Sequence, residues 1–131
     1  MKSIVLNIGG QDRTFHFGLG FLGNLLENEN IQLHEISAKL LKNSYKWMPL
    51  VMYHSLAWGY IRKNENVPFD VLDIADWIDE LTEFDDVEVV LANETTTVKL
   101  QTVVRTFFTS FWGSINNNVP TDTSKKKVTK K

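Results

Sequence analysis

The sequence predicts a mostly α, α+β fold: a compact helical domain with an N-terminal two-stranded β-hairpin and a disordered C-terminal tail. Three observations predict this class. A Gly-Gly pair separates two β-rich runs near the start, apolar residues at helical spacing fill the middle, and apolar residues become rare after Gly113. A chain of 131 residues is long enough for one core. We therefore expect a single domain over residues 1–113 and a flexible basic tail over residues 114–131.

The expected hairpin pairs residues 3–8 with residues 13–17. Both runs are rich in β-branched and aromatic residues, and the glycines at 9–10 allow the positive φ of a tight turn. A two-stranded hairpin alone is only marginally stable in water, so its apolar side chains must pack against later segments. The side chains expected to do so are Val5, Phe15 and Phe17.

Helical segments follow the hairpin, because apolar residues recur there every three or four positions. They are residues 21–26, 31 or 33 to 41, 50–62, 71–81 and 100–112. Pro49 suits the start of the third segment, where a helix needs no N–H donor, and Asp70 suits the N-cap of the fourth. The third segment is apolar on nearly all sides and should be the most buried. The expected core includes Leu25, Leu50, Leu56 and Ile74.

Residues 83–92 leave the choice between helix and strand open. Their three valines, Val87, Val89 and Val90, suit a strand as well as a helix. Residues 93–97 are expected to interrupt the chain before the last helix.

Composition excludes several classes of function. The chain has no cysteine, so disulfides, thiol catalysis and thiolate metal sites are ruled out. The net charge of −2 combines +4 on residues 119–131 with −6 on residues 1–118, which predicts no attraction to nucleic acid or anionic lipid. The most apolar window, residues 47–61, is shorter than the roughly 20 residues of a membrane helix. Nucleic-acid and membrane partners are therefore not expected.

No motif in the sequence predicts an enzyme, a cofactor or a metal. Residues 18–23 match G-x-G-x-x-G, but the preceding strand belongs to a hairpin and no second parallel strand follows, which favours glycines that let the chain turn and pack closely. Eleven acidic residues and no basic one lie between positions 63 and 99, without the alternating ligands and central glycine of a calcium loop. A solvated helix face explains them better. The histidines lie in separate elements, with His16 expected on the exposed face of its strand; they are His16, His34 and His54.

Aromatic residues gather on two of the helical segments. Most of them belong in the core. A domain this small is not expected to enclose both helices completely, and leftover aromatic surface marks a protein-binding patch. We place this patch on the last helix, at Phe108, Phe111 and Trp112. Self-association through the same surface is a competing use.

Four short motifs occur in a characteristic order along residues 3–82. Residues 4–10 read IVLNIGG and residues 15–22 read FHFGLGFL. Residues 49–53 then read PLVMY, and residues 75–80 read ADWIDE. In order and spacing, these segments resemble the tail assembly chaperones of long-tailed (siphovirus-type) phages that infect Gram-positive bacteria.

The resemblance implies a non-enzymatic chaperone that binds the tape measure protein, keeps it soluble and promotes assembly of the tail tube. It implies action in the host cell cytoplasm and absence from the mature virion. The patch on the last helix would then bind helical segments of the tape measure protein. The resemblance also implies ribosomal slippage at the lysine run 125–127, because adjacent Lys codons are A-rich, giving an extended form that contacts the major tail tube protein.

Two other classes of protein stay open at this point. A small nucleic-acid-binding phage or bacterial regulator would use residues 33–63 as a helix-turn-helix, although that segment has few basic residues for phosphate contacts. An enzyme that binds a dinucleotide cofactor would use residues 18–23.

Overall fold

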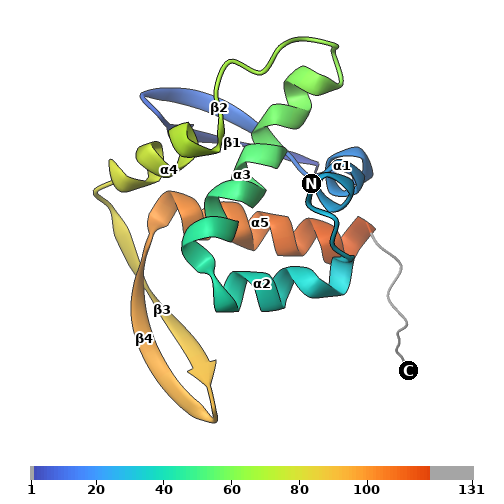
Figure 1. The fold of residues 1–131 in the computed structure, drawn as a ribbon. Helices are drawn as coiled ribbons and strands as arrows, with labels where there is room; N and C mark the ends of the chain where they lie inside the picture. Colours follow the sequence, from blue (N-terminus) through green and yellow to red (C-terminus); the bar gives the residue numbers. More distant parts are fainter. Residues whose placement is uncertain (1, 119–131) are drawn as a thin grey trace.

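A computed structural model describes residues 2–118 of the chain and shows a mostly helical α+β fold with an N-terminal hairpin, which confirms the expected class (Figure 1). The elements in chain order are β1 (Ser3–Ile8), β2 (Gln11–His16), α1 (Leu19–Glu29), the 3-10 turn η1 (Leu33–Glu35), α2 (Ile36–Lys42), α3 (Ser44–Ile61), α4 (Val71–Asp79), β3 (Phe84–Leu91), β4 (Glu94–Gln101) and α5 (Thr102–Asn118).

β1 and β2 form an antiparallel hairpin around a two-residue turn. Gly9 and Gly10 have φ of +64° and +81°, which residues with a Cβ rarely adopt. Side chains at the even positions of β1 face the molecule, whereas Val5 is 59% exposed. The expectation that Val5 packs inward was therefore wrong, because it assigned the wrong face of the strand. Phe15 and Phe17 are buried as expected.

α3 is the central helix of the molecule and packs against β2, α1, α2 and α4. Nine of its 18 residues are buried, which confirms that this segment is the most enclosed of the helices described here. Asn43 begins the helix by accepting hydrogen bonds from the N–H groups of Lys46 and Trp47. The helix thus starts before Pro49, not at it, and the proline lies inside the second turn.

Pro49 is tolerated in this position because of what precedes it. Its missing N–H would have bonded to the Tyr45 carbonyl one turn earlier. Tyr45 is 89% exposed, so water can satisfy that carbonyl, while the apolar proline ring itself is buried. The expected helix start at Pro49 was wrong because a solvent-facing first turn removes most of the penalty.

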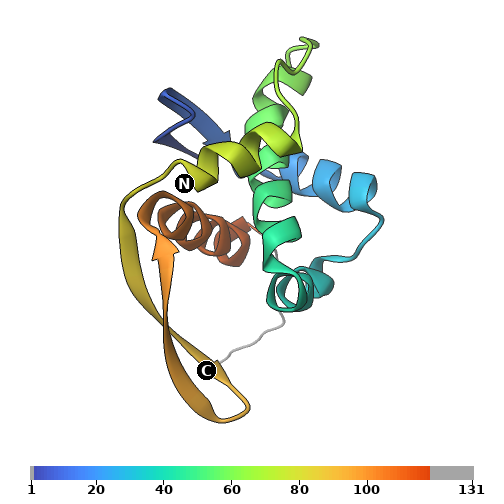
Figure 2. The ribbon, with the colours of Figure 1, turned by 60° about the vertical axis from the view of Figure 1, so that its left-hand side comes forward.

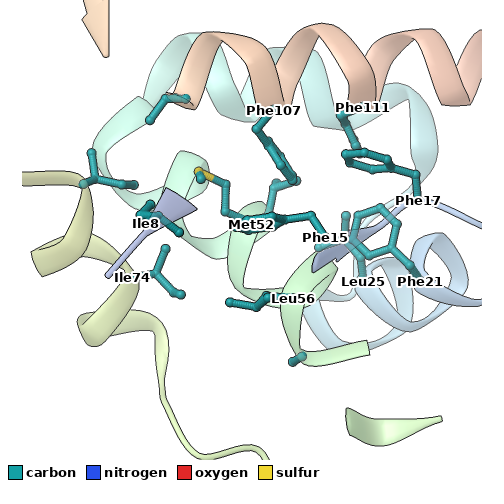
Figure 3. Close-up of a cluster of buried hydrophobic side chains, with 14 of the residues drawn as sticks. Ile8, Phe15, Phe17, Phe21, Leu25, Met52, Leu56, Ile74, Phe107 and Phe111 are labelled. Atoms are coloured by element: carbon teal, nitrogen blue, oxygen red, sulfur yellow. The ribbon is translucent and has the colours of Figure 1, made fainter. Parts of the chain in front are cut away.

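A cluster of buried side chains joins both ends of the chain to the central helix (Figure 3). Phe107 on α5 has its ring centroid 5.3 Å from Phe15 and 5.3 Å from Phe17. Phe111, one turn later on α5, lies 6.0 Å from Phe21 on α1. The four residues expected in the core are all buried: Leu25, Leu50, Leu56 and Ile74.

Asp70 caps α4 as expected. Its carboxylate accepts a hydrogen bond from the Asp73 backbone N–H at 3.0 Å, and the Asp73 carboxylate accepts one from the Asp70 N–H at 2.9 Å. This reciprocal capping box satisfies two donors at the helix start. It accounts for two of the acidic residues in the run between positions 63 and 99.

The segment that follows α4 differs most from the structure expected from the sequence. Residues 84–91 form β3, which resolves the open choice in favour of a strand, and residues 94–101 pair with it as β4. Of the expected interruption at residues 93–97, Asn93 lies in the turn but residues 94–97 belong to β4, as does Leu100, which was expected in the last helix. Ala92 and Asn93 both have positive φ, as a two-residue hairpin turn requires. The β3–β4 hairpin extends away from the helices in both ribbon views (Figures 1 and 2).

α5 starts at Thr102 and continues to Asn118, beyond the expected domain end at Gly113. Ser114 is only 3% exposed, so residues 114–118 belong to the helical body. The small and polar residues of this turn hid the helix from composition-based reasoning. The part of the expected flexible tail at 119–131 lies outside the described residues.

Replacing Leu56 by Asp should unfold the domain. The side chain is 4% exposed in the core, so the change buries an unpaired charge and should lower the free energy of unfolding by about 3 kcal/mol or more. Leu72, which is 73% exposed near the start of α4, offers the control, and Leu72→Asp should change stability by less than about 0.5 kcal/mol. Urea unfolding measures both, and equal losses would contradict this core.

Candidate functional site

The aromatic patch expected on α5 is mostly built into the core. Phe111 has no exposed surface, and its ring points from α5 into the buried cluster (Figure 3). Phe108 and Trp112 lie on the flank of the helix and are half-buried. Their rings pack against the core rings of the same helix, with centroids 4.8 Å apart for Phe107–Phe108 and for Phe111–Trp112. Phe111 therefore cannot contact a partner while the fold is intact.

A more open apolar surface lies on α1, where a hollow of about 510 Å³ runs between this helix and Trp58 of α3. Leu19 at its edge is 63% exposed, and Leu26 is half-buried. The residues that line the hollow are Leu19, Gly20, Gly23, Asn24, Leu26, Glu27 and Trp58. We call it the α1 groove.

Two glycines give the α1 groove its shape. A Cβ at Gly20 would overlap the indole ring of Trp58, so only glycine lets this ring lie against the helix. A Cβ at Gly23 would meet open space, so packing inside the described chain does not require glycine there. Glycine in a helix costs about 1 kcal/mol relative to alanine. Gly23 thus leaves backbone exposed in the groove, where another helix can approach closely.

The polar groups of the α1 groove are few. Glu27 supplies the one charged side chain of the lining. The side-chain oxygen of Asn24 is buried without a hydrogen-bond partner among residues 2–118, a cost that a donor entering the groove could remove after the amide rotates. This lining suits the apolar stripe of an amphipathic helix whose flanking residues are basic or hydrogen-bond donors.

Residues 18–23 do not form a dinucleotide site. The strand before them pairs antiparallel with β1, whereas a pyrophosphate cradle needs parallel strands joined through the helix. Gly18 is the N-cap of α1, and its carbonyl accepts the first helical hydrogen bond, from the Leu22 N–H at 3.1 Å. The role of the glycines is close packing, as the sequence suggested, and at Gly20 the contact is with Trp58.

A second hollow of about 400 Å³ lies between β2 and the end of α3. Arg13 lines it, but its guanidinium is already held by the carbonyls of Ile8 and Gly9, at 2.9 and 3.2 Å, and lies 3.9 Å from the centroid of the Trp77 ring. Lys63 lines the opposite side, and the carboxylates of Asp12 and Glu65 balance the two cations. The lining of this hollow thus contains as many carboxylates as cations, and its Arg13 is already engaged by backbone carbonyls.

His16 lies in this second hollow and is half-buried, not exposed as expected. Its imidazole lies against Gly59 of α3, where a Cβ would come within 2.7 Å of Nε2. Burial lowers the pKa of His16 from its ordinary value of 6.5, and the nearby charges of Arg62 and Lys63 lower it further. The imidazole is neutral in the folded protein at pH 7.

His54 forms a contact that its sequence position did not suggest. Nε2 lies 2.8 Å from a carboxylate oxygen of Glu29, at the end of α1 and 25 residues earlier in the chain. The imidazole is almost fully buried, and Nδ1 has no partner among residues 2–118. The neighbouring Ser55 hydroxyl donates to the His16 carbonyl at 2.8 Å, so it is not a nucleophile activated by His54. The contact between His54 and Glu29 joins α3 to the end of α1.

The acidic run supplies local contacts at several positions. Asp85 lies 3.3 Å from Arg105 and accepts a hydrogen bond from Thr102, and Asp86 lies 2.7 Å from Lys99. In the part of the chain that is described, no group of three or more His, Asp or Glu side chains could hold a metal ion. These carboxylates stabilise helix ends and the second hairpin.

Comparison with known proteins adds no assignment. No family model, no curated protein and no solved structure matches this chain. Between residues 2 and 118, no helix is long and apolar enough to span a membrane. The function therefore has to follow from the surfaces of the molecule itself.

The sequence contained a signal for the α1 groove that was interpreted only as local packing. Leu19, Gly23 and Leu26 are spaced by four and three residues, so they share one face of a helix. The adjoining face carries the core residues Phe21, Leu22 and Leu25, whose larger side chains favour an interpretation of the helix as core packing. Trp58 could not be placed beside them without the tertiary structure.

Acid should destabilise the protein partly through His16. In the unfolded chain, His16 binds a proton near its ordinary pKa of 6.5. In the folded chain its pKa is lowered, so His16 binds the proton only at lower pH. Stability is therefore complete above this window and falls as the pH drops through it. Between about pH 7.5 and 5.5, melting temperature should fall more steeply for the wild type than for His16→Gln. Parallel slopes would show that His16 titrates alike in both states.

Proposed function

We propose that this protein is a non-enzymatic tail assembly chaperone of a long-tailed phage of Gram-positive bacteria. It binds helical segments of the tape measure protein, keeps that protein soluble and promotes assembly of the tail tube in the host cytoplasm. It leaves before the virion matures. The observation that carries the proposal is the α1 groove, an open apolar hollow of about 510 Å³ with exposed helix backbone at Gly23.

The groove supports this function because of the kind of partner it fits. Before a tube has assembled around it, a long helical protein exposes apolar stripes, and such stripes make the protein aggregate in water. An amphipathic helix can lay its stripe on Leu19, Leu26 and Trp58, and Gly23 lets its backbone come close. The described body is acidic, so basic flanks on the bound helix would add electrostatic attraction.

The proposed binding surface is the α1 groove instead of the patch on α5 that was expected from the sequence, whereas the proposed partner is the same. Phe111 is buried, and its substitution would report on folding. Phe108 and Trp112 remain half-buried on the flank of α5, packed against the core. The extended form expected from slippage at residues 125–127 would connect the same body to the major tail tube protein.

A nucleic-acid-binding regulator finds less support. α2 and α3 occupy the place of the expected helix-turn-helix, but α3 is enclosed by other elements and cannot enter a groove of DNA. Eleven acidic residues between positions 63 and 99 would repel phosphates. Binding of duplex DNA that weakens steeply with salt would reverse this preference.

The α1 groove can be tested by filling it without disturbing the core. Gly23→Arg places a long side chain in the hollow, where a Cβ meets open space, and should leave stability equal or improved. Gly113→Arg is a matched control on α5, because a Cβ there also meets open space. Co-expressed tape measure protein should stay soluble with wild type and Gly113→Arg, and soluble yield should fall by about tenfold with Gly23→Arg, since most of the contact is lost.

Two other results would contradict the proposal. If Gly23→Arg folds and protects the tape measure protein as well as wild type does, the α1 groove is the wrong surface. Trp112→Ser then tests the flank of α5. If wild type never keeps the tape measure protein soluble, the chaperone function itself is wrong.

A further inference from the structure

The β3–β4 hairpin has two strands and no third partner among the described residues. It is fastened to the helices at its base, where the Thr102 N–H donates to the Glu83 carbonyl at 2.9 Å and Arg105 pairs with Asp85. All of residues 94–99 on β4 are exposed. Two-stranded hairpins are marginal in water, and both outer edges of this one can accept another strand.

The two edges differ in charge. In an antiparallel ladder, directly opposite residues alternate between pairs whose backbones hydrogen-bond to each other and pairs whose backbones do not. Because Thr102 bonds to Glu83, every second pair counted from there along the hairpin is hydrogen-bonded. By this alternation, Glu88 and Thr97 stand opposite each other without bonding, so their backbone groups point outward. The β3 edge then presents Asp86 and Glu88, which repel a second acidic edge. The β4 edge is uncharged from residue 95 to 98.

We propose that β4 pairs antiparallel with β4 of a second copy of this chain, about a two-fold axis at Thr97. The two hairpins then form one four-stranded sheet. This arrangement uses the edge that lacks repulsion and leaves both acidic β3 edges outside. It is also closed, whereas β4 on β3 of the next copy would leave free edges and grow into open chains.

The position of the axis follows from the valines. Val87 pairs with Val98 within one hairpin, and Val89 pairs with Thr96, all on the same face. With the axis at Thr97, Val98 of one copy lies opposite Thr96 of the other. On this face, two rows of side chains then cross the sheet. Each row has four residues, and every one of them is valine or threonine. A shift of the axis by one residue would bring Glu94 or Asp85 into these rows.

The acidic β3 edges do not oppose this dimer. In the four-stranded sheet the β3 strands are three strand spacings apart, which is about 14 Å. This separation exceeds the Debye length of about 8 Å at physiological salt, so Asp86 and Glu88 of the two copies are screened from each other. Lys99 remains paired with Asp86 inside each copy.

A charge exchange at Thr97 tests the axis directly. Thr97→Lys puts a lysine opposite Glu88 within the hairpin, which should not weaken it, but puts two lysines opposite each other in the dimer. Thr97→Asp puts two carboxylates opposite each other in the dimer, and it also puts a carboxylate opposite Glu88 within the hairpin, so circular dichroism and melting temperature must first show that this variant still folds. Each variant should raise the dimer dissociation constant by about two- to fivefold. An equimolar mixture should restore dimers, most of them mixed, in sedimentation velocity with one variant fluorescently labelled.

A proline pair separates the two edges. Thr97→Pro removes the outward N–H of β4 and should raise the dissociation constant by about tenfold or more, because two intermolecular hydrogen bonds are lost. Glu88→Pro makes the same change opposite it on the β3 edge and should leave the dimer intact. A monomeric wild type, loss of the dimer with Glu88→Pro, or retention of it with Thr97→Pro and Thr97→Lys would each overturn the proposal.

Discussion

The contact on which the rest of the structure depends is the packing of the N-terminal hairpin against the C-terminal helix. Phe15 and Phe17 meet Phe107 across some 90 residues of chain, with ring centroids 5.3 Å apart in both pairs. A hairpin of two six-residue strands could not persist alone, and α5 has an aromatic face that needs cover. Each element supplies what the other lacks, and their contact joins the two ends of the helical body around α3.

The central helix determines which surfaces are left for partners. α3 is apolar on nearly all sides, so β2, α1, α2 and α4 are all used to cover it. α1 gives its Phe21 and Leu25 side to the core and no other described element covers the opposite side, where Gly23 lies. The β3–β4 hairpin contributes Leu100 at its base to the packing around the core, whereas residues 94–99 of β4 stay exposed. The surfaces available for binding are therefore those that the enclosure of α3 does not use.

The sequence predicted the elements whose local signals agree with their tertiary surroundings. The Gly9-Gly10 turn and the Asp70 cap are local chemistry, and both were located from sequence. The start of α3 was misplaced because solvent at Tyr45, a tertiary property, decides whether Pro49 is tolerated. Phe111 was assigned to a surface because periodicity gives a face but not its depth. β4 was missed because four consecutive exposed polar and β-branched residues resemble a loop until their pairing with β3 is known.

The two proposed surfaces reinforce each other physically. A single α1 groove is lined by few large apolar side chains, so one helix bound there should dissociate readily. A chaperone that must give up its partner to a growing tube needs contacts of this kind. A dimer joined through β4 carries two grooves, and if one long partner spans both, the second contact forms at an effective concentration of about millimolar. Under the proposed function, such a dimer would hold a long helical protein in solution while each contact is displaced separately, one groove at a time, as the tube advances.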